Sequence, residues 1–206
     1  MDKPGAAQSV IMIGAPGVAR SNPDFPAIEV MNTILGGSFS SRLNQNLRET
    51  KGYTYGAGSQ FIYRPVPGPF VARAAVRTDV TDSSLVEFFA ELNRIRDSAV
   101  TSGELERARN YIVLGLPGDF ETTGQMGNQI GDLLTFGLPT TYFDTYIRRV
   151  MAVTTSDVQR VARAYFDPAK VDVVVVGDVA KIRPGIEALG LGPVTIRDLE
   201  GREAAP

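Results

Sequence analysis

The stretch Ile34-Leu-Gly-Gly-Ser-Phe-Ser-Ser-Arg-Leu-Asn-Gln-Asn-Leu-Arg-Glu-Thr-Lys-Gly-Tyr-Thr-Tyr55 is the most informative part of this chain, because it decides where Arg48 and Tyr55 lie in the fold. Its spacing predicts a helix from about Ser40 to Gly52, because glycine commonly closes a helix at the position after its last turn. The residues Tyr53 to Tyr63 are rich in aromatic and β-branched types, which is typical of a strand. Arg48 then lies in the last turns of the helix and Tyr55 at the start of the strand. A cation and a phenol therefore converge on one end of the fold.

The segments on either side predict a strand, a helix and a hairpin. Ser9 to Gly14 is an apolar strand. A helix follows it, with Ser21 or Asn22 as its cap, Pro23 in its first turn, and Gly36-Gly37 as its stop. Phe70 to Arg77 is the returning strand of an antiparallel hairpin.

The second half of the sequence is mostly helical. Thr81 is expected to cap a long helix, and capping boxes at Thr101–Glu104 and Thr154–Asp157 open two more. The remaining expected elements are helices at 125–136, 142–150 and 180–189, a buried strand at 170–177 and an edge strand at 194–197.

This order of elements favours an α+β fold: one mostly antiparallel sheet with helices packed on one face. Residues 1–8 are expected to be a linker, 9–200 a single domain, and 201–206 a tail. The strand residues expected in the core are Val10, Ile11, Phe61, Phe70, Val71, Val174 and Val176.

Composition excludes most catalytic chemistry. The chain of 206 residues has no His and no Cys, so it lacks the usual general base and the commonest zinc ligands. Its net charge of −2 gives no basic field for nucleic acid or anionic lipid. No apolar run reaches membrane-spanning length. We therefore expect no complete catalytic centre and no nucleic-acid or membrane partner.

Four groups of residues in the sequence are candidate sites. The glycine-rich turn 36–42 could cradle an anion, but a tight helix–helix connection is favoured. Gly127 and Gly131, one helical turn apart, favour close helix packing. The acidic residues 104–132 favour a solvated face, with Glu104 explained by its capping box. Arg48 and Tyr55, on spacing alone, favour a surface arginine and a half-buried sheet tyrosine.

A family resemblance favours a functional interpretation of Arg48 and Tyr55. Leu35 to Leu43 and Leu47 to Tyr55 resemble the second half of pitrilysin/insulinase-type zinc peptidases, in the processing-peptidase-like branch. The pieces 2–8, 152–162 and 174–178 resemble other parts of the same half, in the same order. The likeness covers nearly the whole chain.

The resemblance implies a division of labour between two similar halves. The first half of such enzymes carries the inverted zinc motif His-x-x-Glu-His, and the second supplies an Arg and a Tyr to the substrate. The matching positions here are Arg48 and Tyr55. The implied function is the C-terminal, non-zinc-binding half of a zinc metalloendopeptidase, inactive alone, with zinc in the missing half or a partner subunit and a peptide as substrate. The alternative is a non-catalytic scaffold or partner subunit. A bacterial periplasmic or envelope location is an extrapolation from similar proteins.

Overall fold

The computed structural model describes residues 1–198 and 200–203, which form one antiparallel sheet with helices on one side. The sheet has 4 strands in the order β2-β3-β1-β4, and each neighbouring pair is antiparallel. The strands are β1 (Gln8–Pro16), β2 (Thr54–Phe61), β3 (Pro69–Arg77) and β4 (Asp172–Val176). The α+β class and the antiparallel hairpin of β2 and β3 confirm the prediction from sequence.

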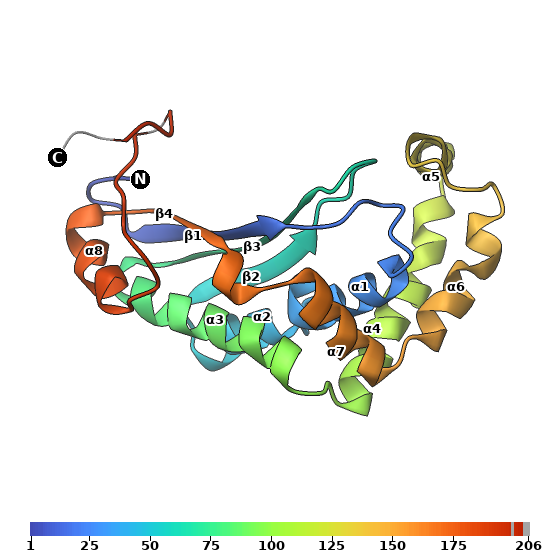
Figure 1. Ribbon diagram of the computed structural model, residues 1–206, viewed down its shortest axis with the longest axis horizontal. Helices are drawn as coiled ribbons and strands as arrows, with labels where there is room; N and C mark the ends of the chain where they lie inside the picture. Colours follow the sequence, from blue (N-terminus) through green and yellow to red (C-terminus); the bar gives the residue numbers. More distant parts are fainter. Residues whose placement is uncertain (199, 204–206) are drawn as a thin grey trace.

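The helical layer lies on one face of the sheet and leaves the other face uncovered (Figure 1). The α-helices are α1 (Phe25–Asn32), α2 (Arg42–Asn44), α3 (Thr81–Asp97), α4 (Ser102–Gly115), α5 (Thr123–Thr135), α6 (Tyr142–Ala152), α7 (Thr155–Tyr165) and α8 (Val179–Ala188). Two π-helical turns, η1 (Thr33–Gly37) and η2 (Gln45–Thr50), extend α1 and α2. Three 3₁₀ turns complete the set: η3 (Thr78–Val80), η4 (Leu116–Phe120) and η5 (Pro168–Lys170). No helix among the described residues is long and apolar enough to cross a membrane.

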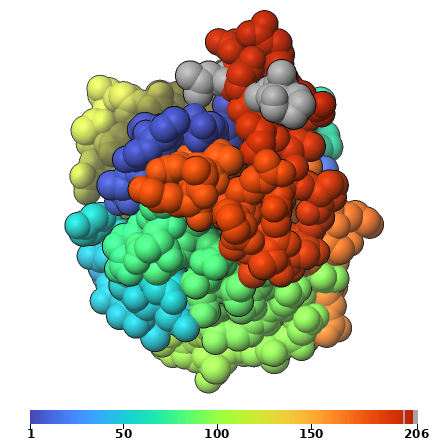
Figure 2. All heavy atoms as spheres, turned by 90° about the vertical axis from the view of Figure 1, so that its left-hand side faces the viewer, coloured from blue at the N-terminus to red at the C-terminus, as the bar shows by residue number. Residues whose placement is uncertain are grey.

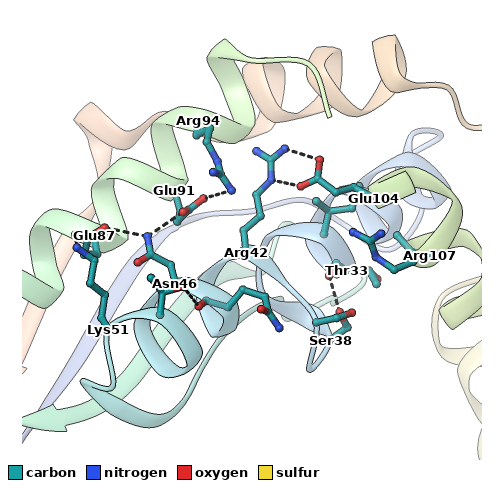
Figure 3. Close-up of a pocket in the computed structure, with 15 residues that line it drawn as sticks. Thr33, Ser38, Arg42, Asn46, Lys51, Glu87, Glu91, Arg94, Glu104 and Arg107 are labelled. Carbon is teal, nitrogen blue, oxygen red and sulfur yellow. Dashed lines mark hydrogen bonds and ion pairs between the residues drawn. The ribbon is translucent and has the colours of Figure 1, made fainter. Parts of the chain in front are cut away.

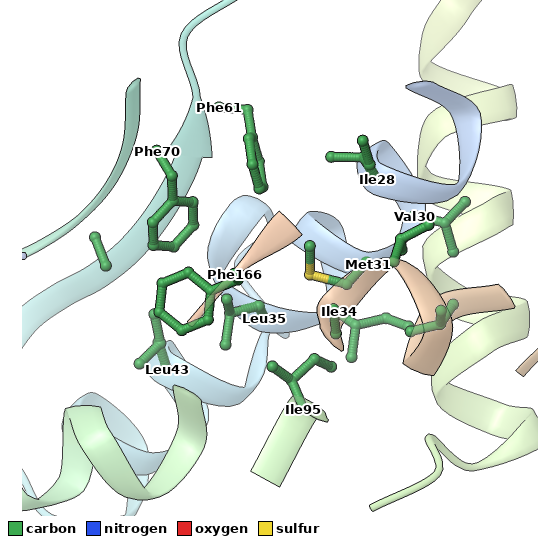
Figure 4. Close-up of a cluster of buried hydrophobic side chains, with 14 of the residues drawn as sticks. Ile28, Val30, Met31, Ile34, Leu35, Leu43, Phe61, Phe70, Ile95 and Phe166 are labelled. Carbon is green, nitrogen blue, oxygen red and sulfur yellow. The ribbon is translucent and has the colours of Figure 1, made fainter. Parts of the chain in front are cut away.

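The core lies between the sheet and the helices α1, α3 and α7. Phe70 of β3 packs edge-on against Phe166, with ring centroids 4.9 Å apart. Figure 4 shows these rings beside Leu35 and Leu43 from the segment that joins α1 to β2. Burying side chains of this size stabilises the fold by about 1.5–3 kcal/mol each.

Several predictions of local structure need correction. The first helix begins at Phe25 with Pro26, not Pro23, in its first turn, and no side chain caps it. Thr81 does not cap α3, because it is the first residue of the helix and Val80 occupies the cap position. Its hydroxyl oxygen lies 2.9 Å from both the Ser9 hydroxyl and the Thr78 carbonyl, and it shares its one proton between them. Both capping boxes are confirmed. Residues 194–197 form no strand.

The strand core was predicted only in part. Ile11, Phe61 and Phe70 are buried, as expected. Val10 and Val174 are instead 44% and 45% exposed, because they point to the uncovered face of the sheet. Val71 and Val176 are half-buried. The error came from treating both faces of the strands as covered.

The two ends of the described chain meet beside β4. The N-terminal ammonium donates to the carbonyl of Val175, and the amide of Lys3 donates to the carbonyl of Gly177. The C-terminal part of the described chain lines a cavity with Met1. Figure 2 shows this end, with the N-terminal residues in blue and the C-terminal ones in red.

A close backbone approach joins the helical layer to strand β2. A Cβ atom on Gly36 would lie 2.3 Å from the amide nitrogen of Ser59, so no larger residue fits there. Beside it, Asn32 and Ser59 exchange two hydrogen bonds, of 2.8 and 3.1 Å, between buried groups. The glycine-rich turn is therefore the tight connection that was favoured from sequence. Gly127 and Gly131, in contrast, have no atom within 4 Å of an added Cβ, so the predicted close packing is wrong within the described chain.

These two kinds of glycine give a matched test. Gly36→Ala forces β2 away from η1, and we expect it to lower the free energy of unfolding by about 2–4 kcal/mol. Gly127→Ala lies in an open helix interior, so we expect it to stabilise the chain by about 0.5–1 kcal/mol. Urea denaturation followed by circular dichroism measures both. Equal stability of the two variants would contradict the role given to Gly36.

Candidate functional site

Arg48 lies in the π-helical segment η2, just before the chain reverses. The amide of Gly52, which has a φ of +64°, donates to the Arg48 carbonyl over 3.1 Å. The predicted glycine stop is confirmed. The Arg48 guanidinium carbon lies 4.5 Å from the ring centroid of Phe39, and one of its nitrogens lies 3.4 Å from the Glu49 carboxylate. Segments of π-helix occur frequently at functional sites.

Tyr55 lies in a β-bulge of strand β2. Thr54 pairs with Val76 and Ala57 with Ala74, so Tyr55 and Gly56 together stand opposite the single residue Ala75. The Thr54 hydroxyl donates to the carbonyls of Ala75 and Gly56 over 2.6 and 2.9 Å, which fixes the bulge. Bulges re-aim a side chain away from the regular pleat.

The bulge leaves the Tyr55 side chain almost wholly in solvent. It is 90% exposed, so the half-buried tyrosine expected from spacing alone is wrong. A large aromatic side chain held at the surface by a specific backbone irregularity has its phenol free to bind another molecule.

Phe39 belongs to the same unit and was missed by the sequence analysis. Its side chain is 67% exposed and forms the surface on which the Arg48 guanidinium rests. The buried Asn44 side chain donates to the Phe39 carbonyl over 2.8 Å and accepts from the amide of Ala57 over 3.3 Å. Asn44 therefore ties the loop that carries Phe39 to the strand that carries Tyr55. The available signal was one aromatic residue in a turn otherwise made of Gly and Ser.

The structure thus brings Arg48, Phe39 and Tyr55 onto one helix–strand unit. Within residues 1–198 and 200–203, no hydrogen bond or ion pair joins Arg48 directly to Tyr55. A guanidinium and a phenol can bind a carbonyl oxygen or a developing oxyanion. They supply no general base and no nucleophile for hydrolysis at neutral pH.

The residues present do not fit a zinc ion. Zinc in proteins is held by His, Cys and carboxylate side chains, and this chain contains neither of the first two. Among the described residues, no three potential ligands gather in one place. The acidic residue Glu104 serves its capping box instead, as expected.

A cleft of about 420 Å³ opens on the other side of η2. Figure 3 shows cations and carboxylates side by side along it, with the Arg42 guanidinium facing Glu104. The ion pairs are Arg42–Glu104 at 2.7 Å, Lys51–Glu87 at 2.7 Å and Arg94–Glu91 at 2.9 Å. Because Arg42, Lys51 and Arg94 each have a carboxylate partner, the cleft is a polar seam that joins η2 to α3 and α4. Arg107 also lines the cleft but forms no ion pair within the described part of the chain.

The Arg42–Glu104 pair is the most buried of these. Arg42 is 7% exposed, and it donates from Nε and Nη2 to the two carboxylate oxygens of Glu104. Partial burial raises the pKa of Glu104, but hydrogen bonds from Arg42 and Thr101 outweigh it and hold that pKa at about 2. The carboxylate therefore stays ionised until strongly acidic pH.

The fold and the site define a class of protein: an α+β domain in which one helix–strand unit carries an exposed tyrosine and an arginine stacked on an exposed phenylalanine, with no cluster of three potential metal ligands among the described residues. The first 112 residues match the family model described as the peptidase M16 inactive domain. The chain belongs to this family.

Relatives and solved structures agree with that assignment. The chain is 31% identical over 187 residues to an uncharacterized zinc protease of Streptomyces coelicolor, covering 89% of this chain and 37% of that protein. It superimposes on the peptidase M16 inactive domain from Pseudomonas fluorescens with a TM-score of 0.80 at 25% identity, covering 86% of this chain and 42% of the other. A chain of complex III from Candida albicans shares the fold, with a TM-score of 0.74 at 15% identity over 91% of this chain and 48% of that one. The chain therefore spans less than half the length of each.

The ion pair in the seam gives a stability prediction. Glu104→Gln keeps the capping box, since Gln also serves at this position, but leaves the buried Arg42 without its counter-ion. We expect the free energy of unfolding at pH 7 to fall by about 3 kcal/mol. Thermal and urea unfolding measure this change.

The same pair predicts a dependence on acid. Because the folded-state pKa of Glu104 is lowered, its contribution is present above the unfolded-state value and is lost as the pH falls from about 5 to 2. Glu104→Gln should therefore flatten the loss of stability in this window. An unchanged acid profile would contradict the assigned pair, and Glu106→Gln, an exposed change on the same helix, is the control.

Proposed function

We propose that this chain is the non-zinc-binding half of a zinc metalloendopeptidase, and that Arg48 and Tyr55 position the peptide at a zinc held by another half. The observation that carries the proposal is the way the helix–strand unit, formed by η2 and β2, holds these two side chains. A bulge holds Tyr55 out into solvent, 90% exposed, while Arg48 rests on the Phe39 ring on the same unit. Membership of the peptidase M16 inactive-domain family supports it.

The chemistry of the pair suits peptide hydrolysis. Attack of a metal-activated water on a peptide carbonyl places negative charge on its oxygen. A guanidinium and a phenolic O–H aimed at that oxygen, or at the next carbonyl, stabilise this charge and hold the peptide extended. Phe39 restricts the guanidinium to one side of its ring, so Arg48 loses less freedom when the peptide binds.

The zinc would come from outside this chain. The Streptomyces relative, named as a zinc protease, has more than half of its length outside the matched region. We infer that a zinc-binding half, in the same polypeptide or in a partner subunit, faces the uncovered side of the sheet. The exposed apolar residues there, Val10, Met12 and Val174, suit a face that is enclosed between the two halves together with the bound peptide.

A second candidate is a non-catalytic scaffold. The shared fold with a chain of complex III supports it, since that protein is part of a respiratory assembly by its name. A scaffold has no use for a tyrosine that is held in solvent by a bulge and set beside a stacked arginine. The site therefore favours the peptidase half.

The assignment of the pair predicts kinetic losses. In the assembled peptidase that contains this chain, Arg48→Ala or Tyr55→Phe should lower kcat/KM by roughly 10- to 1,000-fold, because each removes one preorganised donor. The zinc content should stay unchanged, since neither side chain is a ligand. Peptide cleavage and metal analysis measure the two effects.

Matched controls come from exposed residues far from the unit. Arg148→Ala on α6 and Tyr111→Phe on α4 remove the same groups from other helices. Both should keep normal kinetics. Normal activity in the Arg48 and Tyr55 variants as well would refute the proposed function.

Phe39 is expected to act through Arg48. Phe39→Leu should lower kcat/KM by about two- to fivefold, the worth of an exposed cation–π contact, while Phe39→Tyr restores it. Nuclear magnetic resonance of the chain alone gives a second readout: ring-current shifts of the Arg48 side-chain protons that vanish in the Leu variant and return in the Tyr variant. Shifts that persist in Phe39→Leu would show that the ring does not position Arg48.

A further inference from the structure

The uncovered face of the sheet holds an arginine that has no partner. On an antiparallel sheet, residues in register point to the same side. The central row of the uncovered face runs Gly58–Arg73–Met12–Val174 from β2 to β4. Arg73 is exposed, and within the described chain its side chain makes no hydrogen bond or ion pair.

The neighbours of Arg73 within its own row are apolar or lack a side chain. Met12 beside it is 42% exposed and Val174 is 45% exposed. Gly58, its neighbour on β2, leaves the opposite flank without a Cβ atom. The next rows are Ala75–Val10–Val176 on the side of the bulge, and Gln60–Val71–Gly14–Asp172 on the other side.

An unpaired guanidinium in this setting suits a carboxylate. Its planar fork of N–H donors matches the two oxygens of an Asp or Glu side chain, and the apolar neighbours reduce competition from water. The contrast with the polar seam on the other side of η2 is direct, because Arg42 and Arg94 there already have carboxylate partners.

The row of Arg73 also has a fixed relation to Tyr55. The bulge that carries Tyr55 stands opposite Ala75, two residues from Arg73 along β3. Two residues of a strand span about 6.6–6.8 Å, and an extended peptide repeats its side chains on one face at the same spacing. A peptide that lies along the strands therefore presents to Arg73 a side chain two positions from the residue at Tyr55.

We propose that Arg73 is a specificity residue, which selects a peptide with an Asp or Glu two positions from the residue held at Tyr55. The occupant of this sheet face is then an extended acidic peptide. This inference rests on the proposed function, because it takes the peptide to lie beside Tyr55.

The test uses the 206-residue chain and two nonapeptides that differ only in a central Glu or Gln within a frame of Thr and Ala. Nuclear magnetic resonance titration to millimolar peptide measures both affinities, with the methyl groups of Val10 and Val174 as reporters. The Glu peptide should bind about fivefold more tightly at low salt, and the preference should shrink as salt is added. Arg73→Gln should abolish the preference, Arg73→Lys should retain part of it, and Arg148→Gln should leave it intact.

Equal affinity for the two peptides, the absence of shifts at Val10 and Val174, or an unchanged preference in Arg73→Gln would each overturn the proposal. The backbone spectrum of each variant verifies that it is folded. A glutamate preference that depends on Arg73, found together with normal kinetics of the Arg48 and Tyr55 variants, would remove the proposed function alone. Kinetic losses in those variants without any glutamate preference would remove the role of Arg73 alone.

Discussion

The contact between Gly36 and strand β2 is the constraint on which the rest of the site depends. The backbone of η1 approaches Ser59 so closely that only glycine fits, and the exchange of hydrogen bonds between Asn32 and Ser59 satisfies the buried polar groups on both sides. This contact sets the position of the chain that leaves η1, and with it the loop of Phe39. The Asn44 bridge then ties that loop to β2 near Tyr55. Glycine at position 36 is thus required by the approach of two backbones.

The sequence predicted the architecture correctly because hydrophobic periodicity and helix capping depend on residues that are close together in the chain. The capping boxes, the glycine stop at Gly52 and the hairpin were all readable from spacing. The sequence did not predict features that depend on tertiary contacts, such as which face of a strand is buried. Val10 and Val174 have the composition of core strand residues, but no helix lies over their face. Thr81 looks like a cap, but a neighbouring strand offers its hydroxyl a partner in Ser9.

The site residues also differ in how far the sequence predicts them. Arg48 and Tyr55 were singled out by a family resemblance, since spacing alone favoured a half-buried tyrosine. The bulge that exposes Tyr55 follows from a one-residue mismatch between β2 and β3, which no local pattern reveals. Phe39 stands out in the sequence only as an aromatic residue in a Gly- and Ser-rich turn, because its partner, Arg48, lies nine positions away on a π-helical turn. The sequence does not single out Arg73 for another reason. Its proposed role depends on the lack of an ion-pair partner for its guanidinium and on its position in the central row of the uncovered face.

The two faces of the sheet therefore have different physical roles. The covered face buries Ile11, Phe61 and Phe70 and supplies the free energy that holds the strands in register. The uncovered face contributes little to that sum and leaves apolar side chains in water. The exposed apolar residues of this face do not stabilise the isolated chain. Their composition is therefore explained by the molecule that binds there. An unpaired cation in an apolar row of this face, two residues along β3 from the position opposite an exposed phenol, is a pattern that an extended peptide with a carboxylate complements at both points.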